Sequence, residues 1–466
     1  MNDILILRPR IEIGLPRRHH LLLSITTFLL AVFLFAGCFC GTAYGQQPST
    51  SNPPPANALT LETAIQLALA QASMFQQAQI NERLAAEDVR QAQAAYLPKL
   101  VSPINFIYTS PLIGAPPGLP RDPAFIAANG LTEYEALIGV TGELDVAGRL
   151  RTTLKRNRAL LEAAHAGTEA ARIALVQATG EAYFGLALAV ARQNAAEANL
   201  NAAQEFEKIT DLLVNGGEVA QIDLVKARLQ TNSRRDELEQ ARVNASAAAD
   251  SLRVFLGPDF TTAVAVTDLT QTLPELGEIE RFTAETMSRR PELAQFEAQR
   301  RASEFDVSLA RAERRPQLTY NLAGGFDSDT LKPEPLRNHS GTTATVSLTI
   351  PIFDWGASRS RERQAALRAQ ALESTRTLAL RVFAQQFYTA RAQASSAAER
   401  IKLAKAALPD AENNLALSII RYREGEAQVI EVTDAQNTLV ATRVALYQAI
   451  FDYQVALTRL KQATGQ

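Results

Sequence analysis

The chain is poor in the residues that build disulfides, metal sites and cofactor pockets. Its 466 residues include two cysteines, four histidines, three methionines and one tryptophan. Both cysteines, Cys38 and Cys40, lie near the N-terminus, so no later segment can contribute one to a disulfide or a metal site. The sequence also has no P-loop, no G-x-S-x-G elbow and no H-E-x-x-H helix. We therefore expect no cofactor, no metal site and no enzymatic activity.

The chain also lacks an excess of charge of either sign. It has 47 lysines and arginines against 49 aspartates and glutamates. This balance argues against the basic surface that nucleic-acid binding requires, so we expect no nucleic-acid partner.

The N-terminus has the pattern of an export signal. Four arginines between positions 8 and 18 precede an apolar run over 21–36, which is too short for a comfortable membrane-spanning helix. Small residues at 43 and 45 predict ordinary cleavage after Gly45, which makes 1–45 a signal peptide. The segment ending at Cys38 instead resembles a lipobox, which would leave that cysteine lipidated.

The segment after the signal, 46–58, is rich in proline and serine and is predicted to be an extended tether. No later stretch looks long and apolar enough for a transmembrane helix. An exported chain of this kind is soluble, lipid-anchored or a membrane β-barrel.

The rest of the chain is an internal repeat. Gly217 and Gly425 are separated by 425 − 217 = 208 positions, and Gly257 and Gly465 have the same spacing. The sequence predicts a first repeat over 59–257, a crossover linker over 258–281 and a second repeat over 282–466. Each repeat is predicted to contain a helix, a strand pair, a long helix, a glycine turn and another helix.

The predicted helices carry seven-residue repeats, which are typical of helices that supercoil against partners. Two long helices are predicted near 154–213 and 359–423, with a kink at Pro409. A helix of about 60 residues would be about 90 Å long. The clearest heptad rows are Leu224, Thr231, Leu238, Ala245 and Leu252 in the first repeat, and Val432, Leu439, Leu446, Tyr453 and Leu460 in the second.

Four segments with alternating apolar and polar residues are predicted to be β-strands, near 101–112, 134–145, 317–326 and 343–353. In TATVSLTIPI (343–352), for example, apolar side chains occupy every second position. One such strand alone would favour a half-buried strand of a soluble protein, whereas four of them suit a lipid-facing barrel. Single-chain bacterial barrels start at about eight strands, so these four would need strands from other copies of the chain.

With these features together, the chain resembles the outer-membrane efflux protein family, the TolC-like channels. The stretches that carry the resemblance are YREGEAQVIEVTDAQNTL (422–439) and AIFDYQVALTRLKQATG (449–465), and the likeness extends over about 59–466. It implies a mainly α fold with a small membrane β part. Four strands from each of three chains would make a trimeric 12-stranded β-barrel, continued by an α-helical barrel.

The resemblance also implies a place in a larger machine. The homotrimer would sit in the outer membrane lipid of a Gram-negative-type cell, with its helices in the periplasm. Its partners would be a periplasmic adaptor protein and an inner-membrane pump of the RND or the ABC type.

In that family the glycine turns form the periplasmic tip, and acidic residues beyond the second turn surround the narrowest point. The matching positions are Glu431 and Asp434, which are three residues apart and share a helix face. The alternative is that these acids only favour a helix N-terminus. The first repeat has Asp223 and Lys226 at the equivalent positions and is not assigned to the constriction. The adaptor would dock at Gly216, Gly217, Tyr422 and Gly425.

The implied function is a passive exit channel for drugs or other small toxic molecules. The same fold also suits the exit duct of a type I protein secretion system, and the sequence does not separate the two. A periplasmic coiled-coil adaptor without a pore would explain the heptads but not the four alternating strands. The scarcity of methionine and histidine disfavours a dedicated copper or silver channel.

Overall fold

The computed structural model describes residues 59–110, 132–257, 259, 264–269 and 277–466. The predicted signal peptide, the tether and Cys38 lie outside these residues, as do most of the loop after the first strand and parts of the crossover linker.

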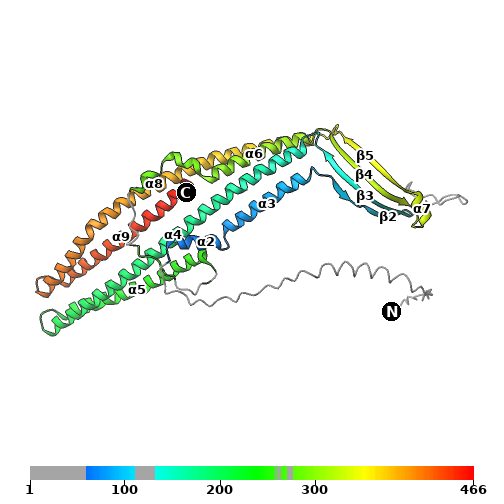
Figure 1. Cartoon of the computed structure of the whole chain (residues 1–466). Helices are drawn as coiled ribbons and strands as arrows, with labels where there is room; N and C mark the ends of the chain where they lie inside the picture. Colours follow the sequence, from blue (N-terminus) through cyan, green and yellow to red (C-terminus); the bar gives the residue numbers. More distant parts are fainter. Residues whose placement is uncertain (1–58, 111–131, 258, 260–263, 270–276) are drawn as a thin grey trace, which may run out of the picture. The chain divides into compact units, whose positions relative to one another are not determined.

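Two helices of 67 residues each dominate the described chain: α4 (Arg149–Asn215) and α8 (Ala357–Arg423). At 1.5 Å per residue each is about 100 Å long. Each is followed by a glycine turn and a shorter helix, α5 (Gln221–Leu256) or α9 (Val429–Ala463), which packs back against it (Figure 1). The second long helix, α8, continues through Pro409, the residue at which the sequence predicted a kink.

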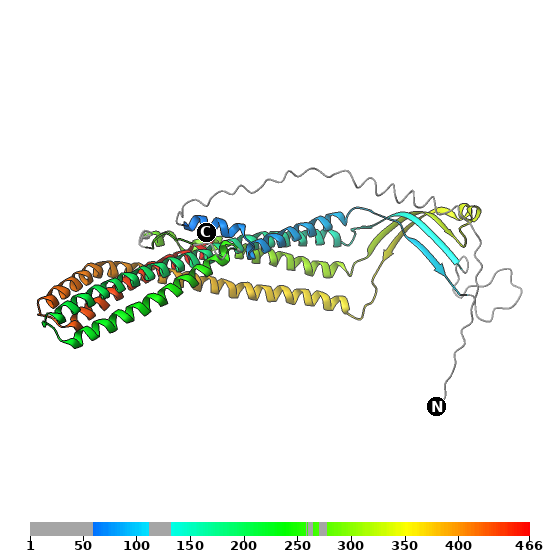
Figure 2. The same ribbon diagram turned by 90° about the horizontal axis from the view of Figure 1, so that it is seen from below.

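Further helices pack against the two long helices, and α9 contacts both of them. Helix α3 (Met74–Ala94) packs on α4, and α6 (Pro291–Ala312) packs on both α4 and α8 (Figures 1 and 2). Local signals start these helices: Ser73 caps α3 and Pro291 opens α6. The shorter elements are α2 (Leu61–Ala70), α7 (Pro333–Asn338) and the 3-10 turns η1 (Glu278–Arg281) and η2 (Ala284–Arg289).

The predicted heptad rows are buried, which confirms them as the packing faces of α5 and α9. In α5, Leu224, Leu238 and Leu252 are buried, and in α9 so are Val432 and Leu460. Small residues beside these rows, such as Ala227 and Ala449, are also buried. Such residues let the helix backbones approach closely and leave little side-chain entropy to lose.

The main core lies midway along α4 and α8, where Tyr183, Leu186, Phe387 and Tyr453 pack together with residues of the crossover linker. The sequence-based expectation that no later segment is apolar enough to span a membrane was wrong for α4. An 18-residue window of α4 has a mean hydropathy of 1.5, and 44% of that window is buried inside the chain. Packing in the core accounts for this apolar stretch.

The β part is one antiparallel sheet with the order β1–β3–β4–β5, in which β2 also pairs with β3. Its strands are β1 (Lys99–Val101), β2 (Ile104–Tyr108), β3 (Thr132–Leu144), β4 (Gln317–Ser328) and β5 (Ser340–Thr349).

Two strand predictions differ from the structure. The first predicted strand is split in two at Ser102–Pro103, because proline has no N–H to donate to the ladder. The Pro103 carbonyl still accepts a 3.0 Å hydrogen bond from Leu137 N, which keeps both halves beside β3. The last strand begins earlier than predicted and ends at Thr349, two residues before Pro351.

The sheet is open at both sides and exposes apolar side chains. In the described residues, β1 and β2 pair only with β3, and β5 pairs only with β4. Large apolar side chains on these strands are exposed, among them Ile104 at 76%, Ile138 at 64% and Val346 at 70%. A lipid-facing sheet needs such side chains, but open edges inside lipid would leave unpaired backbone groups at a cost of several kcal/mol each.

Gly325 provides a test of how tightly β3 and β4 pack. A Cβ at this position would overlap the Ala136 carbonyl oxygen and lie 2.8 Å from Leu137 Cα, whereas Gly341, its pairing partner on β5, has nothing within 4 Å. We expect Gly325→Ala to lower the free energy of unfolding by about 1–3 kcal/mol, because backbone atoms must move to make room for the methyl group. Thermal melting of purified protein measures this, with Gly341→Ala as the matched control. Equal melting temperatures for the two variants would contradict the close approach.

Candidate functional site at the glycine turns

The two long hairpins end in turns of the same geometry. Gly217 and Gly425 have φ values of +78° and +77°, a conformation that side chains with a Cβ rarely adopt. After each turn the next amide closes back on the helix, from Glu218 N to Leu213 O and from Glu426 N to Arg421 O, both at 2.9 Å. This is the Schellman ending of an α-helix. Gly216 is the C-cap residue of α4 and has ordinary helical angles.

Tyr422 lies inside the molecule rather than on the surface of the turn. It is 2% exposed, its ring centroid lies 5.0 Å from that of Phe206, and its hydroxyl lies 3.4 Å from Thr210 Oγ1. Val429 and Val432 of α9 pack in the same cluster. Burial raises the pKa of the Tyr422 hydroxyl, the hydrogen bond with Thr210 lowers it, and the negative charge of Asp223 raises it further.

The Tyr422 side chain therefore joins the second hairpin to the first, because Phe206 and Thr210 belong to α4. It cannot offer a surface to a partner while it is buried. The exposed residues of the two turns are Asn215, Gly216, Gly217 and Glu218 in the first, and Arg423, Glu424, Gly425 and Glu426 in the second.

Glu431 and Asp434 are both exposed on the first turns of α9, but the groups around the two carboxylates differ. Glu431 Oε2 lies 3.2 Å from Arg421 Nη1, and the same guanidinium donates to the carbonyl of Glu426 at 3.4 Å. Within the described part of the chain, no side chain pairs with Asp434. One of the two carboxylates is thus compensated inside the chain and the other is not.

After the first turn, Asp223 is paired within its own helix. Asp223 Oδ1 lies 3.6 Å from Lys226 Nζ, one helical turn further along α5. Lys226 occupies the position that matches Asp434 in the repeat. The substitution of lysine for aspartate therefore turns an acidic pair into a neutral one.

Polar side chains connect the two hairpins beside the acidic residues. Gln230 of α5 donates to Gln436 of α9 at 2.6 Å and accepts from Thr433 at 2.9 Å, and Arg234 donates to Asn437. Gln436 is 6% exposed, and its Nε2 has no partner among the described residues. The sequence alone did not predict these contacts between α5 and α9, or the ion pair of Arg421 with Glu431. Both form only when folding brings the segments together.

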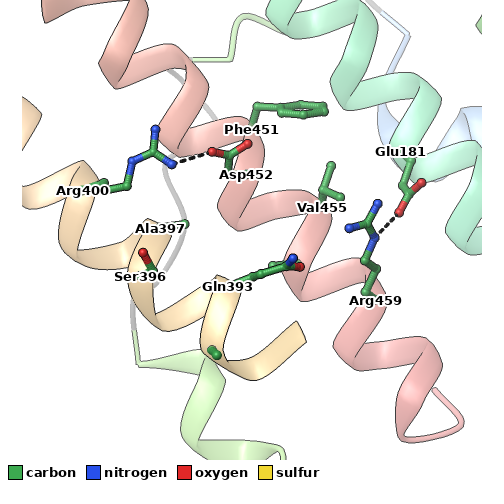
Figure 3. A pocket seen from close by; sticks show the side chains of 11 residues that line it. Glu181, Gln393, Ser396, Ala397, Arg400, Phe451, Asp452, Val455 and Arg459 are labelled. Atoms are coloured by element: carbon green, nitrogen blue, oxygen red, sulfur yellow. Dashed lines mark hydrogen bonds and ion pairs between the residues drawn. The ribbon is translucent and has the colours of Figure 1, made fainter. Parts of the chain in front are cut away.

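A separate cleft of about 580 Å³ lies between α4, α8 and α9. Two ion pairs cross it, as Figure 3 shows: Arg400 with Asp452, and Arg459 with Glu181, both at 2.7 Å. These pairs link α8 to α9 and α9 to α4, so both arginines at the cleft already have an acidic partner. Across the described residues, no group of three or more His, Cys, Asp or Glu side chains is placed to hold a metal ion.

The sequence matches the profile of a known family over nearly all of the two repeats. The family is described as "Outer membrane efflux protein", and the match covers residues 64–258 and 284–466. The chain belongs to the outer membrane efflux protein family. It is therefore a channel of the outer membrane and not an enzyme, and the alternative of a periplasmic adaptor without a pore was wrong.

Individual relatives agree with this membership. The chain is 24% identical to "Pyoverdine export outer membrane protein OpmQ" of Pseudomonas aeruginosa, over 84% of this chain and 83% of that protein. It is 23% identical to "Cation efflux system protein CusC" of Escherichia coli, over 72% of this chain and 73% of the relative.

Among solved structures, the outer-membrane channel OprN superposes with a TM-score of 0.75 at 21% identity, over 87% of this chain and 89% of OprN. That likeness confirms the predicted fold, a β-barrel part continued by an α-helical part.

Substitution of Tyr422 tests its structural role. We expect Tyr422→Ala to lower the free energy of unfolding by about 3–5 kcal/mol, since it removes a buried aromatic ring. Tyr422→Phe should cost less than about 1 kcal/mol, because only a long hydrogen bond with Thr210 is lost. Hydrogen–deuterium exchange of the amides around both turns measures the effect. Equal exchange in the two variants would show that the ring does not join the hairpins.

Proposed function

We propose that the chain forms a homotrimeric exit channel that exports drugs or other small toxic molecules, driven by an inner-membrane pump through a periplasmic adaptor. The observation that carries the proposal is an open, apolar-faced sheet joined to helices of about 100 Å in one chain. Such helices are long enough to carry a tunnel through much of the periplasm. No motif for nucleotide hydrolysis occurs, so energy would come from the pump.

The free edges of the sheet support association with further copies of the chain, and the family resemblance suggests three copies. If β1 and β2 count as one strand position, the chain supplies four positions, with β1 and β2 at one edge and β5 at the other. Pairing β5 of one chain with β1 and β2 of the next satisfies both edges. Three chains then give 3 × 4 = 12 positions, within the range of bacterial outer-membrane barrels.

The acidic residues after the second turn are the proposed constriction. Threefold symmetry would bring three copies of Glu431 and Asp434 together, and crowded carboxylates repel one another and attract cations. The ion pair with Arg421 reduces the charge contributed by Glu431, so Asp434 carries the net negative charge of the ring.

The relatives support small solutes as the cargo. CusC is named for the efflux of cations and OpmQ for the export of pyoverdine, and neither name concerns a polypeptide. This favours the small-molecule channel over the exit duct of a protein secretion system.

Single-channel conductance in a planar bilayer tests the pore and its constriction together. We expect the trimeric wild type to show a small, cation-preferring conductance. The double variant Glu431→Ala, Asp434→Ala should conduct more and prefer cations less, because the crowded carboxylates are gone.

Arg421→Gln is the matched variant, and its expected effect on cation preference has the opposite sign. It should increase the preference for cations, since Glu431 would lose its compensating charge. Unchanged conductance and selectivity in both variants would place the constriction elsewhere, whereas the absence of any channel from folded trimer would contradict the proposed function.

Docking at the turns can be tested by cross-linking to the cognate adaptor. Proline cannot adopt the φ of +77° at Gly425, whereas asparagine tolerates this conformation. We expect Gly425→Pro to lose cross-links that Gly425→Asn retains, with both proteins still trimeric by size-exclusion chromatography. Normal cross-linking of a trimeric proline variant would argue against docking at this turn.

A further inference from the structure

The corner between β5 and α8 contains a small cavity of mixed character. It has a volume of about 270 Å³ and is lined by Arg314, Ile352, Phe353, Asp354 and Arg359, among others. Asp354 builds the corner, because its carboxylate accepts hydrogen bonds from Gly356 N at 3.1 Å and Ser358 N at 2.7 Å. Both of its oxygens are thus occupied by the backbone, which leaves the arginines as the charged groups that face a ligand.

The cavity adjoins the lipid-facing row of β5. Val346, Leu348, Ile350 and Ile352 alternate along the strand and its extension, and their exposed fractions are 70%, 56%, 55% and 93%. The cavity begins at Ile352, where this apolar row ends. It therefore lies where the hydrocarbon core of the membrane gives way to the periplasm.

Aromatic side chains occupy the same level. Trp355 is 90% exposed and makes an edge-on contact with Phe353 at a centroid distance of 4.8 Å. Trp355 also has a φ of +56°, which is unusual for a bulky residue. Tryptophan is enriched where membranes meet water, and an exposed, strained one at this corner is explained by contact with that boundary.

Several arginines follow the aromatic residues at the start of α8. Arg361 pairs with Glu313 at 2.9 Å, and Glu362 pairs with both Arg311 and Arg314, at 2.7 and 3.2 Å. Arg359 and Arg363 are exposed, and no acidic side chain of the described residues pairs with either. They are four residues apart and so share a face of the first two turns of α8.

The helix directs these two arginines toward the membrane. Side chains on an α-helix tilt toward its N-terminus, and the N-terminus of α8 is the corner itself. Long arginine side chains can lay their aliphatic stems on apolar surface while the guanidinium stays in the polar layer. Guanidinium groups bind phosphate through paired hydrogen bonds.

We propose that this corner binds the headgroup of an anionic phospholipid of the membrane leaflet that faces the periplasm. Arg359 and Arg363 contact the phosphate, and Arg314 completes the cationic wall of the cavity. Ile352, Phe353 and Trp355 contact the start of the acyl chains. The bound lipid fixes the height of the channel in the membrane, because the corner is held to the sheet on one side and to α8 on the other.

The single tryptophan makes the corner directly observable, because Trp355 is the only one in the chain. The full-length protein is reconstituted in phosphatidylcholine vesicles that contain either brominated phosphatidylglycerol or an equal fraction of brominated phosphatidylcholine. Bromine quenches tryptophan fluorescence only at short range. We expect stronger quenching by brominated phosphatidylglycerol, with a relative association constant of at least about fivefold, the contribution expected of one arginine at an anionic surface.

The double variant Arg359→Gln, Arg363→Gln should lower this preference to about onefold while Trp355 stays accessible to both lipids. The matched control is Arg381→Gln, Arg391→Gln, which removes two exposed arginines further along the same helix and should leave the preference unchanged; neither pairs with an acidic side chain in the part of the chain that the structure describes. Equal quenching by the two lipids in the wild type would overturn the proposal. So would a preference that survives the first double substitution, or the absence of quenching by either lipid.

Discussion

Hydrogen bonding of the backbone at the two edges of the sheet is the constraint on which the rest of the structure depends. One chain makes a sheet whose outer strands, β1 with β2 and β5, each have a neighbour on one side only. In water these edges could be solvated, but in an outer-membrane protein they face lipid, which cannot replace the missing hydrogen bonds. In the proposed trimer, association with identical chains satisfies them. The helices must then follow the same symmetry, because α4 and α8 begin within a few residues of the ends of β3 and β5.

The way the helices pack is compatible with that symmetry. Large buried residues such as Leu238 and Leu439 recur every seven positions, and alanines beside them allow close backbone contact. A seven-residue repeat keeps one stripe of each helix toward its neighbour along the whole length. Helix α5 therefore keeps its buried row against α4, and α9 keeps its row against α8. Ion pairs between Arg400 and Asp452, and between Arg459 and Glu181, link α8 to α9 and α9 to α4 beside the buried rows.

Sequence reasoning found what depends on spacing and missed what depends on folding. The heptad rows were predictable because a seven-residue period indicates which positions are buried. The turns were predictable because glycine is the residue that most readily adopts a left-handed φ. The split at Pro103 was not predicted, because the alternation of apolar residues continues on both sides of it. The signal was present, since proline cannot donate a hydrogen bond within a sheet. The burial of Tyr422 and the pairing of Arg421 with Glu431 could not be predicted. Both depend on contacts that exist only once the chain has turned back on itself.

The difference between the two turns shows how a duplicated unit can acquire one special end. Both copies keep the glycine at C′ and an acid in the first turn of the following helix, Asp223 or Glu431. In the first copy the next residue on the same face is Lys226, which pairs with Asp223, so this acid is compensated. In the second copy the cation comes from the preceding helix as Arg421, which leaves the next position on the face free for Asp434. Moving the compensating charge from one side of the turn to the other thus creates an uncompensated carboxylate without changing the backbone. In the proposed trimer, that carboxylate is what distinguishes the hairpin at the constriction from the hairpin beside it.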